Sequence, residues 1–194
     1  MNAALFISDY AVRVQPGCRA GPHRGTARQG GIRGKVPRSP RYTAGVVPKR
    51  CGVTRVDRVV VNKARREMLL LAGGNVLRAY RIALGFDPVG HKTREGDGRT
   101  PEGRYVIERR NPRSAYHLAL RISYPNQGDR QRAEALGVDP GGDIMIHGLP
   151  NGVDSAGRGH PERDWTRGCI AVSDTEIEEI WSLVADGTAI EINP

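Results

Sequence analysis

Short runs of alternating apolar and polar residues fill the chain between residues 53 and 147, and this period of two is typical of β-strands. The expected strands cover residues 56–61, 67–71, 76–84, 104–108, 116–122 and 143–147. Turn residues such as Gly73-Gly74-Asn75 separate them, so the first three runs predict an antiparallel meander. Glycine and proline punctuate the segment 85–104, which is expected to be a loop.

Two segments have helical patterns. A short helix is expected over residues 129–136. The clearest helix begins after Ser173, which forms a capping box with Glu176 in the first turn, and it ends at Gly187. Its apolar residues have helical spacing: Ile177, Ile180, Trp181 and Val184. A strand at 188–192 closes the chain. Strands dominate, so the sequence predicts a mainly-β fold, a β-sandwich or partial barrel with one clear helix.

The distribution of charge divides the chain into two parts. The first fifty residues contain ten Lys or Arg and one acidic residue, whereas the rest contains twenty of each sign, so the net charge of +9 arises in the first part. Residues 1–52 are expected to be a disordered basic tail and residues 53–194 a single domain. Two other interpretations of the tail stay open: a nucleic-acid-binding arm, or sequence that precedes the true start.

The cysteines and the apolar runs exclude several classes of protein. Cys18, Cys51 and Cys169 form no C-x-x-C pair, which argues against a zinc ribbon or a thioredoxin-type motif. No apolar run approaches the ~18 residues that a membrane span needs. The apolar stretch 3–7 has no preceding basic residue and is followed by Asp9, so it does not resemble a secretory signal.

Two short segments near the C-terminus carry the residues best suited to chemistry. The apolar run 144–146 leads into His147 and Gly148, and Gly168-Cys169 leads into the apolar run 170–172. On adjacent strands, His147 could accept the proton of the Cys169 thiol. The glycine at 168 would let backbone N–H groups face a developing oxyanion. The long polar loop between the segments, 148–167, is a feature that is usually functional.

These residues also have structural interpretations. Free cysteine is among the most buried residue types, so Cys169 would be a core residue, and His147 would be a core or strand-end histidine. A zinc site made of His147, His160 and Cys169 is another alternative, although no second cysteine or paired-histidine spacing supports it. Trp165 either packs the loop down or contacts a ligand.

The two segments resemble the L,D-transpeptidase catalytic domain family (YkuD-like), in which an upstream His-Gly precedes a downstream Ser/Thr-His-Gly-Cys. The match is closer to the short YafK-like branch of the family, whose pattern is similar to residues 142–152 and 164–172 here. Two further blocks fit, at residues 90–105 and 122–126. The resemblance covers about residues 55–192, with several motifs in the same order.

The resemblance implies a mostly-β fold and an enzyme that acts on peptidoglycan stem peptides. Cys169 would attack the amide carbonyl of a diaminopimelate residue and expel the D-alanine beyond it. His147 would deprotonate Cys169, and the backbone carbonyl of Gly148 would orient His147. An amine of a neighbouring stem, or of a cell-wall-linked protein, would then resolve the thioester. No metal and no organic cofactor is implied.

One position departs from the main family, because Arg167 stands where that family has histidine. This histidine is not the base, so the departure bears on substrate and acceptor. Arg167, Trp165 and Tyr124 are the expected substrate-binding residues. Two alternatives to a transpeptidase stay open: an amidase or hydrolase of the same fold that releases cross-linked protein or D-alanine, and a non-catalytic cell-wall-binding module. The resemblance implies a periplasmic or cell-envelope location, with no nucleic-acid partner and no membrane span.

Overall fold

The computed structural model describes residues 55–153 and 160–194. These residues belong to the second of two units of the chain, which spans residues 49–194. The basic tail expected at 1–52, its boundary with the domain, and part of the long loop at 148–167 lie outside the described residues.

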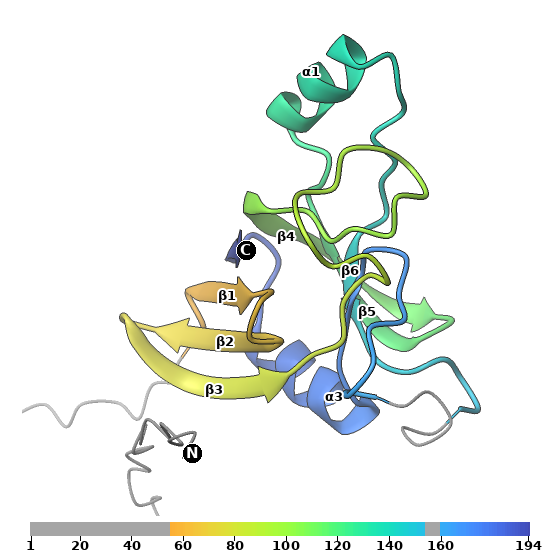
Figure 1. The fold of residues 1–194 in the computed structure, drawn as a ribbon. Helices are drawn as coiled ribbons and strands as arrows, with labels where there is room; N and C mark the ends of the chain where they lie inside the picture. The colour runs from red at the N-terminus through yellow and green to blue at the C-terminus, as the bar shows by residue number, and fades with distance from the viewer. Residues whose placement is uncertain (1–54, 154–159) are drawn as a thin grey trace, which may run out of the picture. The chain divides into compact units, whose positions relative to one another are not determined.

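The described residues form one eight-stranded sheet and two helices (Figure 1). The order across the sheet is β3-β2-β1-β8-β4-β5-β6-β7. The strands are β1 (Arg58–Asn62), β2 (Glu67–Ala72), β3 (Asn75–Arg81), β4 (Gly103–Ser114), β5 (His117–Ile122), β6 (Met145–His147), β7 (Ile170–Ala171) and β8 (Ala189–Asn193). The helices are α1 (Gln127–Ala135) and α3 (Asp174–Leu183). The prediction of a mainly-β fold is confirmed, and the shorter expected helix accompanies the clear one.

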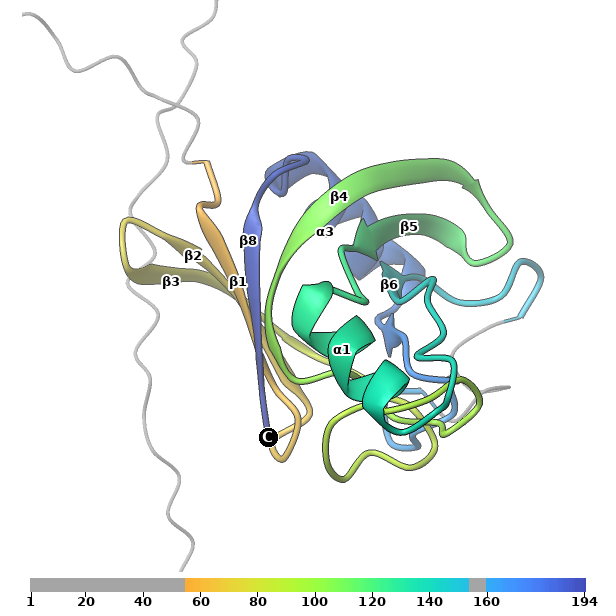
Figure 2. The same ribbon diagram turned by 90° about the horizontal axis from the view of Figure 1, so that it is seen from above.

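Strand β4 joins the two halves of the sheet. Its first residues, 103–106, pair antiparallel with β8, and its later residues pair antiparallel with β5. Figure 2 shows β4 curving from β8 towards β5, which makes the sheet a partial barrel. Two register irregularities in the β4–β5 ladder accompany this bend, as bulges in bent strands do. The bend places β5 and β6 beside α3.

Helix α3 packs on the half of the sheet that contains the two segments 144–148 and 168–172, which together are called the cassette. The Ser173 hydroxyl accepts the Glu176 N–H, and the Glu176 carboxylate accepts the Ser173 N–H at 2.8 Å, so the predicted capping box is present. Ile177 and Ile180 are fully buried and join the core. The helix contacts β5 and β6. None of the helices within 55–153 and 160–194 is long and apolar enough to cross a membrane.

Candidate active site

Strands β6 and β7 bring the two halves of the cassette together. They are parallel neighbours, with Ile146 opposite Ile170 and His147 opposite Ala171. The Val172 N–H also donates to the His147 carbonyl at 3.0 Å. Because side chains alternate along a strand, His147 and the residue just before β7, Cys169, lie on the same face of this pair.

His147 is held in one tautomer. Its side chain is buried, with a relative exposure of 4% for the residue, and Nδ1 lies 2.6 Å from the Gly148 carbonyl oxygen. A carbonyl only accepts, so Nδ1 carries the proton and Nε2 is the basic nitrogen. Burial lowers the pKa of His147 to about 4, against the opposing effect of the Gly148 carbonyl and with a smaller contribution from His160. The imidazole is therefore neutral at pH 7.

Cys169 is partly exposed, and its thiol donates to the Asp143 carbonyl oxygen at 3.5 Å. Burial of the sulfur raises the pKa of Cys169 above the ordinary value, and the negative charge of Asp143 adds to this effect. The Met145 N–H and the positive charge of Lys92 oppose it. Both members of the pair are therefore uncharged near neutral pH, and the nucleophile needs a base at the moment of attack.

Thr166 braces the segment that carries the nucleophile. Its hydroxyl donates to the Cys169 carbonyl at 2.7 Å and accepts the Gly168 N–H at 3.1 Å. Its backbone N–H donates to the Leu84 carbonyl, and its carbonyl accepts the N–H of Phe86. Strand β7 is also bonded to this neighbouring segment, because Ala83 and Ala171 exchange both backbone hydrogen bonds. Thr166 thus ties Cys169 to the rest of the sheet.

Asp164 anchors the end of the long loop just before Thr166. Its carboxylate accepts three hydrogen bonds from the Arg66 guanidinium, at 2.8 and 3.0 Å to Oδ2 and at 3.2 Å to Oδ1. Oδ1 also accepts the Leu84 N–H at 2.9 Å. The predicted cassette is therefore fixed from both sides: by β6 on one flank and by the segment around Leu84 on the other.

Gly168 adopts a conformation that favours glycine. Its φ is +122°, and a Cβ at this position would lie 2.5 Å from the Arg99 carbonyl oxygen. The residue before Cys169 thus has both a left-handed backbone and a close backbone neighbour. The sequence-based expectation of close backbone approach at this glycine agrees with this packing.

Replacing Gly168 with alanine is expected to destabilise the domain by about 1–3 kcal/mol from backbone strain alone, with the contact to the Arg99 carbonyl adding to the cost. Gly74→Ala is the matched control, since Gly74 has φ +79° and nothing within 4 Å of the added Cβ. Thermal unfolding of both variants measures the difference. Equal losses of stability in the two variants would show that the contact of the added Cβ with the Arg99 carbonyl does not destabilise the domain.

The expected substrate-binding residues lie in different surroundings. Arg167 is exposed beside Cys169. Trp165 lies with its ring edge-on to His147, with centroids 5.8 Å apart. Tyr124 is buried, and its hydroxyl donates to the Pro140 carbonyl at 2.9 Å. The Tyr124 ring contacts the rings of His91 and Tyr105. The substrate-binding roles of all three residues stay predictions.

The sequence did not point to Tyr116, whose ring lies closest to His147, with a centroid separation of 4.5 Å. Tyr116 stands at the start of an expected strand, which gives no sign of a contact with a residue far along the chain. Among the described residues, no group of three or more His, Cys, Asp or Glu side chains is arranged to hold a metal ion.

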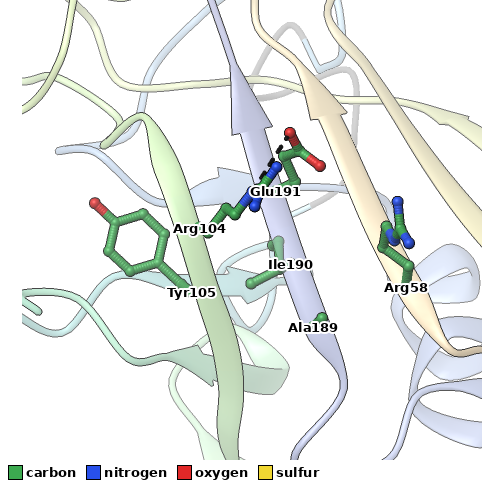
Figure 3. Close-up of a pocket in the computed structure, with 6 residues that line it drawn as sticks. All are labelled: Arg58, Arg104, Tyr105, Ala189, Ile190 and Glu191. Atoms are coloured by element: carbon green, nitrogen blue, oxygen red, sulfur yellow. Dashed lines mark ion pairs between the residues drawn. The ribbon is translucent and has the colours of Figure 1, made fainter.

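A shallow depression of about 260 Å³ lies over β1, β8 and β4 (Figure 3). It is lined by Arg58, Arg104, Tyr105, Ala189, Ile190 and Glu191. The Arg104 and Glu191 side chains form an ion pair across it at 3.9 Å. None of the expected site residues lines this depression, so it and the Cys169–His147 pair are separate features of the surface.

The family model described as the L,D-transpeptidase catalytic domain (YkuD) matches residues 56–192, which is most of the chain. The chain belongs to the L,D-transpeptidase catalytic domain family. The resemblance inferred from the cassette is thereby confirmed. The matched range includes every strand and helix described above, apart from Asn193 at the end of β8.

Two kinds of relative support this membership. The chain is 32% identical over 111 residues to the protein named YafK of Escherichia coli strain K12, a match that covers 56% of this chain and 37% of that protein. The structure is similar to that of the helical cell shape determining protein Pgp2 from Campylobacter jejuni, at 27% identity and TM-score 0.53, over 71% of this chain and 47% of that one. It is also similar to Bd1075 of Bdellovibrio bacteriovorus, at 25% identity and TM-score 0.51, over 72% and 48%. The chain thus matches less than half the length of these relatives.

Acid is expected to destabilise this L,D-transpeptidase-family domain through His147. The unfolded chain protonates this histidine near pH 6.5, but the folded protein does so only near pH 4. The contribution of the neutral His147 to the free energy of unfolding is therefore fully present above pH 6.5. It falls by roughly 3 kcal/mol as the pH is lowered to 4. Urea unfolding at pH 7 and pH 4.5, with His147→Gln as the variant that cannot titrate, measures it. Equal pH dependence in both proteins would contradict the expectation.

Proposed function

We propose that this protein is a peptidoglycan-modifying cysteine enzyme, an L,D-transpeptidase that forms an acyl-enzyme on Cys169. The observation that carries the proposal is the arrangement of Cys169 and His147 on one face of β6 and β7, in a member of a family that acts on peptidoglycan. The single-tautomer imidazole supports it, because Nε2 is left as the proton acceptor. The expected site of action is the periplasm or cell envelope.

In the proposed first step, the Cys169 thiol turns about its Cα–Cβ bond from the Asp143 carbonyl towards Nε2 of His147. His147 takes the thiol proton as the sulfur attacks the carbonyl carbon of a diaminopimelate amide in the stem peptide. The C–N bond to the terminal D-alanine breaks, and His147 delivers the proton to the leaving amine. A thioester on Cys169 remains. General base assistance of this kind contributes about 100–10,000-fold in rate.

The developing oxyanion needs hydrogen-bond donors near Cys169. The Gly168 N–H already donates to Thr166 Oγ1, so we assign this role to the N–H of Cys169 itself. The bond from Thr166 to the Cys169 carbonyl fixes the peptide plane on the other side of the residue. Loss of one such donor typically costs about 100–1,000-fold in rate.

The second step decides the outcome of the reaction. An amine of another stem, or of a cell-wall-linked protein, would attack the thioester and give a transpeptidase product. Water would give trimming or release, which is the amidase or hydrolase alternative. Both share the same acyl-enzyme, and neither requires a metal or an organic cofactor in this mechanism. Arg167 and Trp165, which precede Cys169 in the same segment, are proposed to contact the substrate.

The test uses the full chain, wild type and Cys169→Ala, incubated with intact peptidoglycan that carries its attached proteins. Mass spectrometry of the muropeptides then reports the products. Cys169-dependent loss of terminal D-alanine with new cross-links would support transfer. Cys169-dependent release of attached protein, or opened cross-links, would support the hydrolase. If neither protein changes the peptidoglycan, the enzyme proposal fails and a binding module is favoured, which a sacculus co-sedimentation assay checks.

A further inference from the structure

The turn between β4 and β5 carries an aromatic residue that lies against the proposed base. The rings of Tyr116 and His147 have centroids 4.5 Å apart and planes inclined by 42°. Trp165 meets the same imidazole edge-on, with centroids 5.8 Å apart at 63°. The two aromatic rings also stack on each other at 6.3 Å and 25°. His147 thus contacts a pair of mutually packed aromatic rings that come from two distant parts of the chain.

The position of Tyr116 is set by hydrogen bonds on both sides of its turn. The Tyr116 N–H donates to the Ser114 hydroxyl at 3.0 Å. Asn151, four residues after His147, donates its N–H to the Ala115 carbonyl at 3.0 Å and accepts the His117 N–H at 2.9 Å. The Asn151 side chain also donates to the Ser114 carbonyl at 3.2 Å. The segment that follows the base therefore holds the turn that carries Tyr116.

We propose that Tyr116 is a positioning residue that, together with Trp165, fixes the plane of the His147 imidazole and keeps water from its face. The hydrogen bond from Nδ1 to the Gly148 carbonyl fixes only one edge of the ring. Aromatic packing restrains the ring face, and such pairs contribute about 0.5–1.5 kcal/mol beyond the area they bury. Nε2 then stays directed towards the nucleophile side of the site. This inference rests on the proposed function of His147 as the base.

The ring of Tyr116 is the functional part in this inference. The residue retains 39% of its surface exposed, so its contact with His147 covers the imidazole while another part of the ring faces solvent. A phenylalanine would keep the same ring contact, whereas an alanine would open the face of His147 to water. Hydration favours the charged form of an imidazole, so opening the site moves the protonation of His147 towards its ordinary pH range.

Other groups around His147 act on the same titration. Cys169 lies just before the neighbouring strand β7, and His160 opposes protonation of His147. Helix α3 brings Asp174, which accepts the Leu149 N–H, and Glu176, which favours protonation of His160. None of these groups is altered by a substitution at Tyr116, so their effects are common to all variants of that residue.

The test measures the alkylation rate of Cys169 by iodoacetamide from pH 3.5 to 9, in the full chain with Cys18→Ser and Cys51→Ser. Peptide mass spectrometry reads the modification at Cys169. Alkylation slows when His147 is protonated, because the base can no longer accept the thiol proton. The acid limb of the wild-type profile, which is the pH range in which the alkylation rate falls with added acid, is expected near pH 4. Tyr116→Ala is expected to move it towards pH 6.5, and Tyr116→Phe to leave it in place.

Two further variants complete the design. Val76→Ala removes a half-exposed side chain on β3 and is expected to leave the profile unchanged. Asn151→Ala keeps Tyr116 but removes two of the bonds that hold its turn, and is expected to shift the limb in the same direction by less. If Tyr116→Ala does not fold, as judged by circular dichroism, Asn151→Ala decides. An acid limb that stays near pH 4 in the folded variants would overturn the inference.

The alkylation profile is independent of peptidoglycan. If the protein fails to act on muropeptides but the acid limb shifts as expected, the proposed function fails while the positioning of His147 by Tyr116 stands. If turnover occurs and the limb does not move, the proposed function stands and the role of Tyr116 fails. Turnover adds a second readout, since Tyr116→Ala is expected to lower kcat at pH 5.5 by about tenfold and by less at pH 8.

Discussion

Replacing Cys169 with alanine is expected to abolish turnover of peptidoglycan while leaving the fold intact. The reaction proceeds through a thioester in the proposed mechanism, so removal of the sulfur leaves no group that can carry the acyl intermediate. The side chain is small and partly exposed, and the hydrogen bond that its thiol donates to the Asp143 carbonyl is long at 3.5 Å. The expected change in the free energy of unfolding is therefore within about 1 kcal/mol.

Two measurements establish the result. Muropeptide analysis reports turnover, and thermal unfolding reports stability. Cys51→Ala is the matched control, because it removes a cysteine that the proposed mechanism does not use and is expected to retain full activity. Full activity in Cys169→Ala would exclude the acyl-enzyme mechanism. A large loss of stability in that variant would instead favour the interpretation of Cys169 as a structural residue.

Much of the fold follows from local patterns in the sequence. The period of two between residues 53 and 122 gave strands β1 to β5 to within a few residues, except that β4 runs on to Ser114. The capping box at Ser173 fixed the start of α3, because its two hydrogen bonds involve residues only three positions apart. Both signals are local, so the amino-acid types alone carry them.

The pairing of strands could not be predicted in the same way. β8 inserts between β1 and β4, parallel to the first and antiparallel to the second. This arrangement depends on the pairing of residues that are more than eighty positions apart along the chain. Buried charge is equally hidden: Lys63 is 2% exposed because its ammonium donates to two carbonyls and to Glu102. A lysine in a turn is ordinarily expected at the surface.

Some residues of the candidate site could likewise be recognised from the local sequence, and others could not. His147 and Cys169 stand out because each adjoins an apolar strand and each has a glycine beside it. Tyr116 and Thr166 do not, since their contacts depend on a turn tied to Asn151 and on a bridge to Gly85. The candidate reactive residues could thus be picked out from the sequence, whereas the residues that contact them could be identified only in three dimensions.

Replacing His147 with alanine is expected to lower turnover at pH 7 by about 100–10,000-fold, the range associated with loss of a general base. The size of the effect follows from the resting state of the pair. Burial raises the pKa of Cys169, so little thiolate exists at pH 7 without a base to accept the proton. The variant must wait for the thiol to ionise by itself, whereas the wild type does not.

The pH dependence of this variant distinguishes loss of the base from general damage to the site. Turnover by wild type is expected to change little between pH 7 and 9, since the neutral imidazole is already in place above pH 4. Turnover by His147→Ala is expected to rise about tenfold per pH unit over that range, in step with the thiolate fraction. His91→Ala is the matched histidine control: His91 accepts the Glu102 N–H and pairs with Asp129, so its loss affects stability but not the profile. A flat profile in His147→Ala would mean that His147 does not deprotonate Cys169.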